Sequence, residues 1–122
     1  MPEGNLTYQR GEIRWVNLDP VVGRETSKKR PCVILQNDVG NRFAPTTIVA
    51  PFMPTMKDYP FLVNVKKSTS NGLDCDRQLN LSQIRAVDYS RVGNLQGILE
   101  AKYWSQIKKA INIQLGFFEL FP

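Results

Sequence analysis

The sequence predicts a mainly β protein, a small barrel or sandwich, with one amphipathic helix near the C-terminal end. Short apolar runs are separated by turn signals at intervals typical of small all-β domains. Only after residue 100 does the apolar spacing change to the period of a helix. The 122 residues, of which 42% are hydrophobic and 22% charged, suit one soluble domain with a modest core. We therefore expect a single domain over residues 1–122, with residues 1–9 as a tail.

The first two expected strands lie on either side of a polar loop at residues 19–29. Before the loop, the segment IRWVNL alternates roughly with period two, and after it CVIL at residues 32–35 is a short apolar run. Trp15 here and Trp104 near the C-terminus both fall on apolar faces. We expect core packing for both, with base stacking as the alternative.

Turn signals divide the middle of the chain. Residues 37–43 form a turn-rich connector with room for one short helical turn, and Pro51 and Pro54 are expected to end the strand TTIVA. Residues 66–77, which contain Asn71-Gly72, look the least ordered. Strands or strand-like alternations are expected at residues 46–50, 61–65, 78–87 and 92–98.

The helix is expected over residues 100–115. Its apolar positions share the spacing of one helical face: Tyr103, Trp104, Ile107, Ala110, Ile111 and Leu115. Gly116 is a suitable C-terminal stop. The aromatic run after it, which includes Phe117 and Phe118, could pack back on the barrel or extend an interaction surface.

Charge and composition narrow the functional classes. A net charge of +5 favours an anionic partner, such as nucleic acid or an acidic protein. The complete absence of histidine excludes Ser-His, Cys-His and paired-histidine catalysis and most zinc sites. Glycine-rich nucleotide-binding motifs are missing, and Cys32 and Cys75 have neither metal-binding nor disulfide spacing. Since the chain shows no signal peptide or long apolar segment, we expect a cytoplasmic protein with no cofactor, no metal and no membrane partner.

The loop at residues 19–29 is the most informative segment. It and its far end carry a group of cations, Arg24, Lys28, Lys29 and Arg30, against one acid, Glu25. A basic loop on a rigid sheet is a sensible receptor for a phosphodiester backbone. Pro31 favours extended backbone angles at Arg30, so we expect this guanidinium at the start of the second strand. The alternative is a solvated basic loop without a role.

Several motifs resemble the MazF/PemK toxins of bacterial toxin–antitoxin pairs. They are GEIRWVNLDP, VVGRE, RPCVILQND, YPF and SQIRAVD, in this order, and the likeness covers residues 11–115. The resemblance implies an SH3-like barrel shared with CcdB toxins, a homodimer, and metal-independent, sequence-specific cleavage of single-stranded RNA. It also implies a cognate antitoxin with an acidic, flexible tail, and contact with DNA only indirectly, through the antitoxin complex.

The resemblance assigns the family's catalytic arginine to Arg30 and its loop glutamate to Glu25. Charge stabilisation suits Arg30 better than proton transfer, and Glu25 could orient Arg30, accept a proton, or form an ordinary loop salt bridge. The family's active-site threonine corresponds, without a gap, to Met53, which cannot form a strong hydrogen bond to phosphate. Thr55 lies two residues on, so Thr55 or a backbone amide could replace it, or cleavage could be weak.

Further residues are candidates for contact with RNA. Gln83 and Arg85 match a motif near the RNA groove, with edge-strand hydrogen bonding as the alternative, and Lys57 is a phosphate candidate or a solvated lysine. Asn37 is a further candidate, although closing a turn suits it as well. The full set of RNA-binding candidates is Arg24, Lys28, Lys29, Asn37, Met53, Lys57, Gln83 and Arg85.

Two other functions stay open at this stage. A non-enzymatic poison that binds DNA gyrase, as CcdB relatives do, would not need the missing threonine. An RNA-binding module with weak or lost cleavage would show salt-dependent affinity without products.

Overall fold

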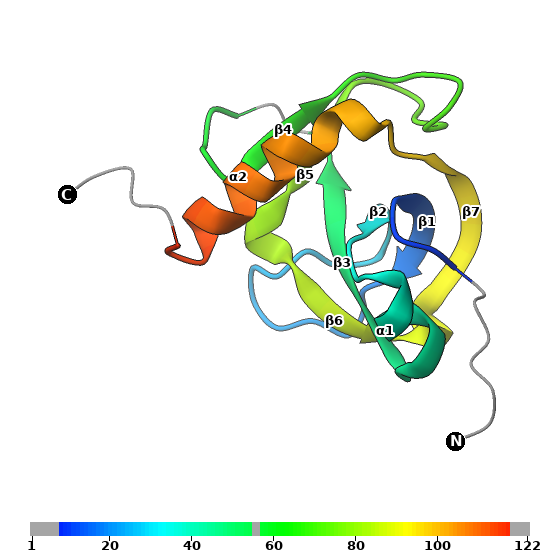
Figure 1. Ribbon diagram of the computed structural model, residues 1–122. Helices are drawn as coiled ribbons and strands as arrows, with labels where there is room; N and C mark the ends of the chain where they lie inside the picture. Colours follow the sequence, from blue (N-terminus) through cyan, green and yellow to red (C-terminus); the bar gives the residue numbers. More distant parts are fainter. Residues whose placement is uncertain (1–7, 55–56, 118–122) are drawn as a thin grey trace.

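The strands form one bent antiparallel sheet in the computed structural model, which describes residues 8–54 and 57–117 (Figure 1). They are β1 (Glu12–Asn17), β2 (Lys29–Ile34), β3 (Thr46–Met53), β4 (Leu62–Val65), β5 (Arg77–Asn80), β6 (Arg85–Asp88) and β7 (Val92–Ile98). The described helices are α1 (Asp38–Phe43) and α2 (Trp104–Gln114), with 3-10 turns η1 (Leu81–Gln83), η2 (Tyr89–Arg91) and η3 (Ala101–Tyr103). The predicted mainly β fold with a C-terminal helix is confirmed.

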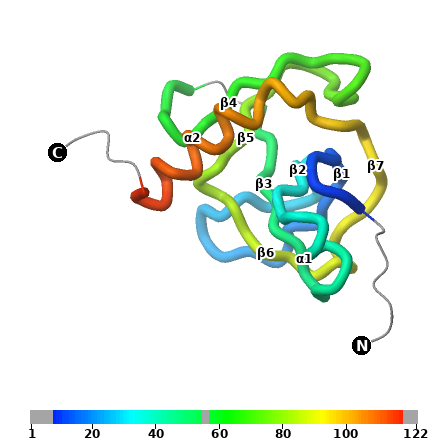
Figure 2. The backbone as a smooth tube through the Cα atoms, in the orientation of Figure 1, coloured from blue at the N-terminus to red at the C-terminus, as the bar shows by residue number. Residues whose placement is uncertain are grey.

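The sheet bends around β3. The strand order is β4-β5-β3-β2-β1-β7, and β6 pairs separately with β3. The first half of β3 pairs with β6, its middle with β2, and its last residues, Phe52 and Met53, with Leu79 and Gln78 of β5. The tube in Figure 2 follows this path, with β3 between the other strands.

Both faces of the central strands are buried. Val33 and Ala50 belong to a large apolar cluster that includes Phe52 and the buried side of α2. Their chain neighbours Cys32 and Val49 belong to a second cluster on the other face of the sheet. Since successive strand residues point to opposite faces, burial on both sides explains why β2 and β3 are nearly continuous apolar runs.

Helix α2 closes the large cluster. It packs against β4 and η1 and buries Ile107 and Ala110 (Figure 1). The helix ends as the sequence predicts, because Gly116 has a positive φ of 80° and donates its N–H to the carbonyl of Ile113 at 3.1 Å.

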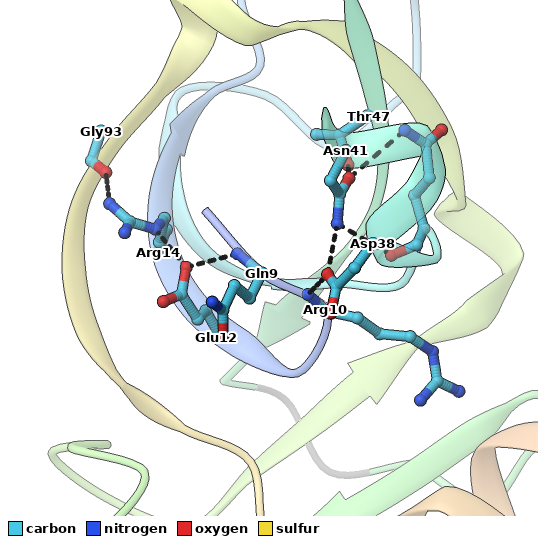
Figure 3. Close-up of polar contacts among 9 residues, drawn as sticks. Gln9, Arg10, Glu12, Arg14, Asp38, Asn41, Thr47 and Gly93 are labelled. Carbon is cyan, nitrogen blue, oxygen red and sulfur yellow. Dashed lines mark hydrogen bonds and ion pairs between the residues drawn. The ribbon is translucent and has the colours of Figure 1, made fainter. Parts of the chain in front are cut away.

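A polar network holds the connection between β2 and β3. Asn41 of α1 is only 3% exposed, and its Oδ1 accepts a hydrogen bond from Thr47 Oγ1 at 2.7 Å. Its Nδ2 donates to Asp38 Oδ1, which also accepts from the backbone N–H of Arg10 (Figure 3). The short helical turn expected in this connector is α1.

Arg14 links β1 to β7. Its side chain donates to Glu12 and to the carbonyl of Gly93 on β7 (Figure 3).

Two strand boundaries predicted from the sequence were wrong. Pro51 does not end β3 but pairs with Cys32, and it lies where β3 leaves β2 for β5, so its missing N–H is tolerated. The alternation at residues 78–87 is not one strand. Asn80 accepts a hydrogen bond from the N–H of Ser82 at 3.0 Å, which starts η1 and turns the chain from β5 into β6.

The core position expected for Trp15 was also wrong. In the regular pairing of β1 with β2, Trp15 shares the face of Ile13, but the large cluster that covers Ile13 does not include Trp15. Trp15 is 43% exposed as a result. Trp104 is half-buried against the large cluster, with the guanidinium of Arg10 3.7 Å from its ring centroid.

The segment between β4 and β5, which looked the least ordered in the sequence, is organised by Asn71. This side chain is fully buried; it accepts from the N–H groups of Ser68 and Leu73 and donates to the carbonyl of Lys66 and to Glu100. Gly97 lies so close to the backbone of Asn71 that an added Cβ would be 2.3 Å from its carbonyl carbon. The segment is therefore packed directly against β7.

We predict that Asn71→Ala destabilises the protein by at least about 2 kcal/mol, because it leaves several buried groups without partners. Urea denaturation measures the loss. Asn94→Ala, at an exposed position of β7, is the matched control and should leave the unfolding midpoint nearly unchanged. Equal midpoints for both variants would contradict the role assigned to Asn71.

The two cysteines differ in their surroundings. Cys32 is fully buried in the second cluster, and burial raises the pKa of its thiol to about 12, whereas Cys75 is exposed. We predict that a maleimide at neutral pH modifies Cys75 alone in the folded protein and both cysteines in urea. Peptide mass spectrometry would check this, and comparable modification of Cys32 in the native protein would contradict it.

Candidate functional site

The cationic loop between β1 and β2 is closed at its base by backbone and side-chain hydrogen bonds. Leu18 donates its N–H to the carbonyl of Lys28 at 2.9 Å, and the N–H of Lys28 binds the carboxylate of Asp19 at 3.0 Å. These two bonds hold Lys28 in a left-handed conformation with φ of 70°, which is uncommon for a residue other than glycine.

Two arginines, from β6 and η2, hold the start of this loop. Arg85 Nη1 donates to the carbonyl of Leu18 at 3.1 Å. Arg91 Nη1 donates to the carbonyls of Asn17 and Asp19. The end of β1 is thus fixed to β6 and η2, although these elements lie far away in the sequence.

The far part of the loop is tethered to η1. Gln83 Oε1 accepts a hydrogen bond from the backbone N–H of Thr26 at 3.0 Å. Gln83 and Arg85, both predicted from the SQIRAVD motif, therefore contact the loop at two separate points.

Arg30 lies on β2 opposite Val16 of β1, so its backbone is part of the sheet rather than of the loop. The side chain is half-buried, and its Nε donates to the carbonyl of Ser27 at 3.0 Å. Neither Nη atom has a hydrogen-bond acceptor within the described residues. The guanidinium is therefore oriented through one nitrogen and keeps its terminal fork for another acceptor.

Arg30 and Arg85 share an electrostatic environment. The positive charges of both residues oppose the effect of burial on the pKa of Cys32, so both lie near this thiol. Cys32 has the same strand parity as Arg30, and Val49, which pairs with Arg85, belongs to the same apolar cluster as Cys32. The two arginines thus flank one region of the sheet.

Glu25 caps its own turn. Its carboxylate accepts the N–H of Val22 at 2.5 Å, and its own N–H binds the carbonyl of Val22. Ser27, not Glu25, orients the Arg30 guanidinium here. Arg24, Lys28 and Lys29 are exposed and leave the outer surface of the loop positively charged.

Met53 ends β3 and Lys57 follows it in the chain; both are RNA-binding candidates from the sequence. Met53 is half-buried, and its Sδ accepts a hydrogen bond from Asn80 Nδ2 at 3.1 Å. The exposed Lys57 is held by its backbone, because the side-chain amide of Gln78 binds both its N–H and its carbonyl. Thr55 lies outside the described residues.

Asn37 is not brought to this region. Its side chain accepts the N–H of Gly40 at 2.8 Å and caps α1, beyond the end of β2 that is farthest from Arg30.

A cavity of about 270 Å³ opens beside Arg30 and contains residues that sequence reasoning did not assign to the site. Its lining includes Trp15, Lys29, Arg30, Phe52, Arg77 and Gln96. Arg77 forms a two-pronged ion pair with Asp74. The exposed tryptophan is an aromatic surface next to three cations, an arrangement typical of single-stranded nucleic-acid sites.

Other kinds of site have less support in the structure. Within residues 8–54 and 57–117, His, Cys, Asp and Glu side chains form no group of three that could hold a metal ion. In the same residues, no helix is both long and apolar enough to span a membrane.

Comparison with solved structures gives the same fold. MazF from Deinococcus radiodurans superposes with a TM-score of 0.77 at 22% identity, covering 92% of this chain and 99% of that one. An endoribonuclease in complex with its cognate antitoxin from a mycobacterial species gives a TM-score of 0.75 at 18% identity, covering 95% of this chain and 100% of that one.

Sequence relatives are closer. The chain is 37% identical over 110 residues to endoribonuclease MazF of Staphylococcus saprophyticus, covering 88% of this chain and 91% of that protein. It is 31% identical over 115 residues to endoribonuclease EndoA of Bacillus subtilis, covering 93% of this chain and 99% of that protein. The family model of the PemK-like, MazF-like toxin of type II toxin–antitoxin systems matches residues 9–115. The match covers most of the chain, which therefore belongs to the family of PemK-like, MazF-like toxins.

Proposed function

We propose that this protein is the toxin of a type II toxin–antitoxin pair and acts as an endoribonuclease on single-stranded RNA. The observation that carries the proposal is the hydrogen bonding of Arg30 beside a cationic loop. Its Nε is bound to Ser27, while its terminal nitrogens have no acceptor among residues 8–54 and 57–117. Membership of the toxin family and the relatives named endoribonuclease support it.

The reaction is an internal transfer at phosphorus. The ribose 2′-oxygen attacks the adjacent phosphorus, the bond to the 5′-oxygen breaks, and the products are a cyclic phosphate and a 5′-hydroxyl. The 2′-hydroxyl loses a proton and the leaving oxygen gains one. Negative charge grows on the nonbridging oxygens during attack, and a fixed guanidinium fork stabilises it without transferring a proton.

RNA binding in this proposal uses the cationic loop and the cavity beside Arg30. The exposed Arg24, Lys28 and Lys29 attract the phosphate backbone, while Trp15 and the cavity beside Arg30 accept an unpaired base. Sequence preference then depends on the tethered loop and on the residues after Met53, because single-stranded RNA is read through stacking and hydrogen bonds to its unpaired bases.

We infer two protein partners as well. An antitoxin with an acidic, flexible tail would complement the exposed cations of the loop; MazF of Deinococcus radiodurans has been solved together with MazE. The second partner is another copy of the chain, giving a homodimer in the cytoplasm. Sedimentation at micromolar concentration would show a single species of monomer mass if the homodimer were wrong.

The proposed activity predicts that purified protein cleaves single-stranded RNA in the presence of EDTA, leaving cyclic phosphate and 5′-hydroxyl ends. Arg30→Ala should lower the cleavage rate by about 100-fold or more, because the developing charge loses its main stabilising group. Gel analysis of an end-labelled RNA, followed by mapping of the 5′ ends, measures rate and site together.

Arg42→Ala is the matched control, since it removes the same charge from the exposed face of α1. Cleavage by the control and none by Arg30→Ala is the expected pattern. Equal cleavage by all three proteins, or none by any of them, would count against the proposed function.

A further inference from the structure

Asn80 is a buried amide whose donor has only a weak partner. The residue ends β5 and is 6% exposed. Its Nδ2 donates to Met53 Sδ at 3.1 Å and, within the described residues, to nothing else. A thioether sulfur is a poor acceptor, so the hydrogen-bonding capacity of this buried N–H is nearly unsatisfied. Unsatisfied buried donors are rare in native structures and often have a functional reason.

The orientation of this amide is fixed. Its Oδ1 accepts both the backbone N–H of Ser82 at 3.0 Å and the Ser82 hydroxyl at 2.6 Å. Turning the amide over would place its NH₂ group against the Ser82 N–H, which can only donate. The Nδ2 atom must therefore point toward Met53.

Met53 ends β3, which lies between the strand of Asn80 (β5) and the strand of Arg30 (β2) in the sheet. Cys32 pairs with Pro51, and the pairing of β2 with β3 ends there, with Arg30 and Met53 each two residues beyond this pair. On the other side, Met53 pairs with Gln78, so Asn80 is its diagonal neighbour on the same face. Arg30 and Asn80 thus belong to the two strands, β2 and β5, that lie on either side of β3, and Asn80 contacts Met53 directly.

We propose that Asn80 Nδ2 donates a hydrogen bond to a nonbridging oxygen of the scissile phosphate, with the Met53 thioether as a cap that this oxygen displaces. The inference rests on the proposed endoribonuclease activity. The hydrogen bond from Asn80 Nδ2 then has a phosphate oxygen as its acceptor in place of the Met53 sulfur. Because this oxygen becomes more negative during attack, the hydrogen bond is strongest in the transition state. Asn80 then supplies the donor that Met53 lacks at the position where the family resemblance expects threonine.

The test is single-turnover cleavage of RNA at saturating protein. Asn80→Asp keeps an oxygen for Ser82 but removes the N–H donor, and we expect the rate to fall by about 100-fold while Asn112→Asp, the same charge change on α2, costs less than about twofold. The loss should appear in the rate at saturation more than in the RNA concentration that gives half the maximal rate.

A second comparison does not depend on the aspartate charge. Met53→Thr places a hydroxyl where the cap lies, so it should raise cleavage about 10-fold or more in an Asn80→Ala background but much less in the unmodified protein. Because residues 53 and 80 are in contact, packing alone can also couple them, so the dependence on background supports a donor to the substrate only where it appears in the cleavage rate and not in the urea midpoint. Circular dichroism and urea midpoints confirm that the variants fold.

The failures are distinguishable. If the unmodified protein cleaves RNA and Asn80→Asp changes the rate by less than about twofold, the role of Asn80 is overturned but the proposed activity is not. Equal effects of Met53→Thr in both backgrounds would lead to the same conclusion. No cleavage by the unmodified protein would overturn the proposed activity and this role together.

Discussion

The hydrogen bonding of β3 to three other strands is the constraint on which the rest of the structure depends. β6, β2 and β5 each take a different part of this strand, so β3 joins the two halves of the sheet at the bend. Arg85, Arg30 and Asn80 belong to these three partner strands. Any shift of β3 by one residue would exchange its two buried faces and separate the groups that the site requires.

Local patterns predicted the elements that depend on local physics. Period-two alternation and turn residues located most strands, and helical spacing with Gly116 located α2 and its end. The failures share a tertiary cause. Pro51 is tolerated because β3 changes partners there. Trp15 is exposed because the large cluster does not extend to it, and the segment around Asn71 is ordered by contacts with Glu100 and β7. None of these partners is near in the sequence.

The site was predictable in part. The charge of the loop and the Arg-Pro dipeptide pointed to Arg30, and the family resemblance pointed to Gln83 and Arg85, which do contact the loop. Asn80 was missed because a polar residue alternating with Leu79 and Leu81 resembles the solvent face of a strand. Only the tertiary structure shows that this face is covered by Met53.

The loop between β1 and β2 and the chain at Lys57 are held in the same manner. Gln83 binds the backbone N–H of Thr26, and Gln78 binds the backbone N–H and carbonyl of Lys57. Because both glutamines bind main-chain atoms, these hydrogen bonds do not depend on which side chains the loops carry. Mutations could thus accumulate on either loop and change which nucleotides are preferred while the scaffold stays intact, so this arrangement lets new target preferences evolve without a new fold.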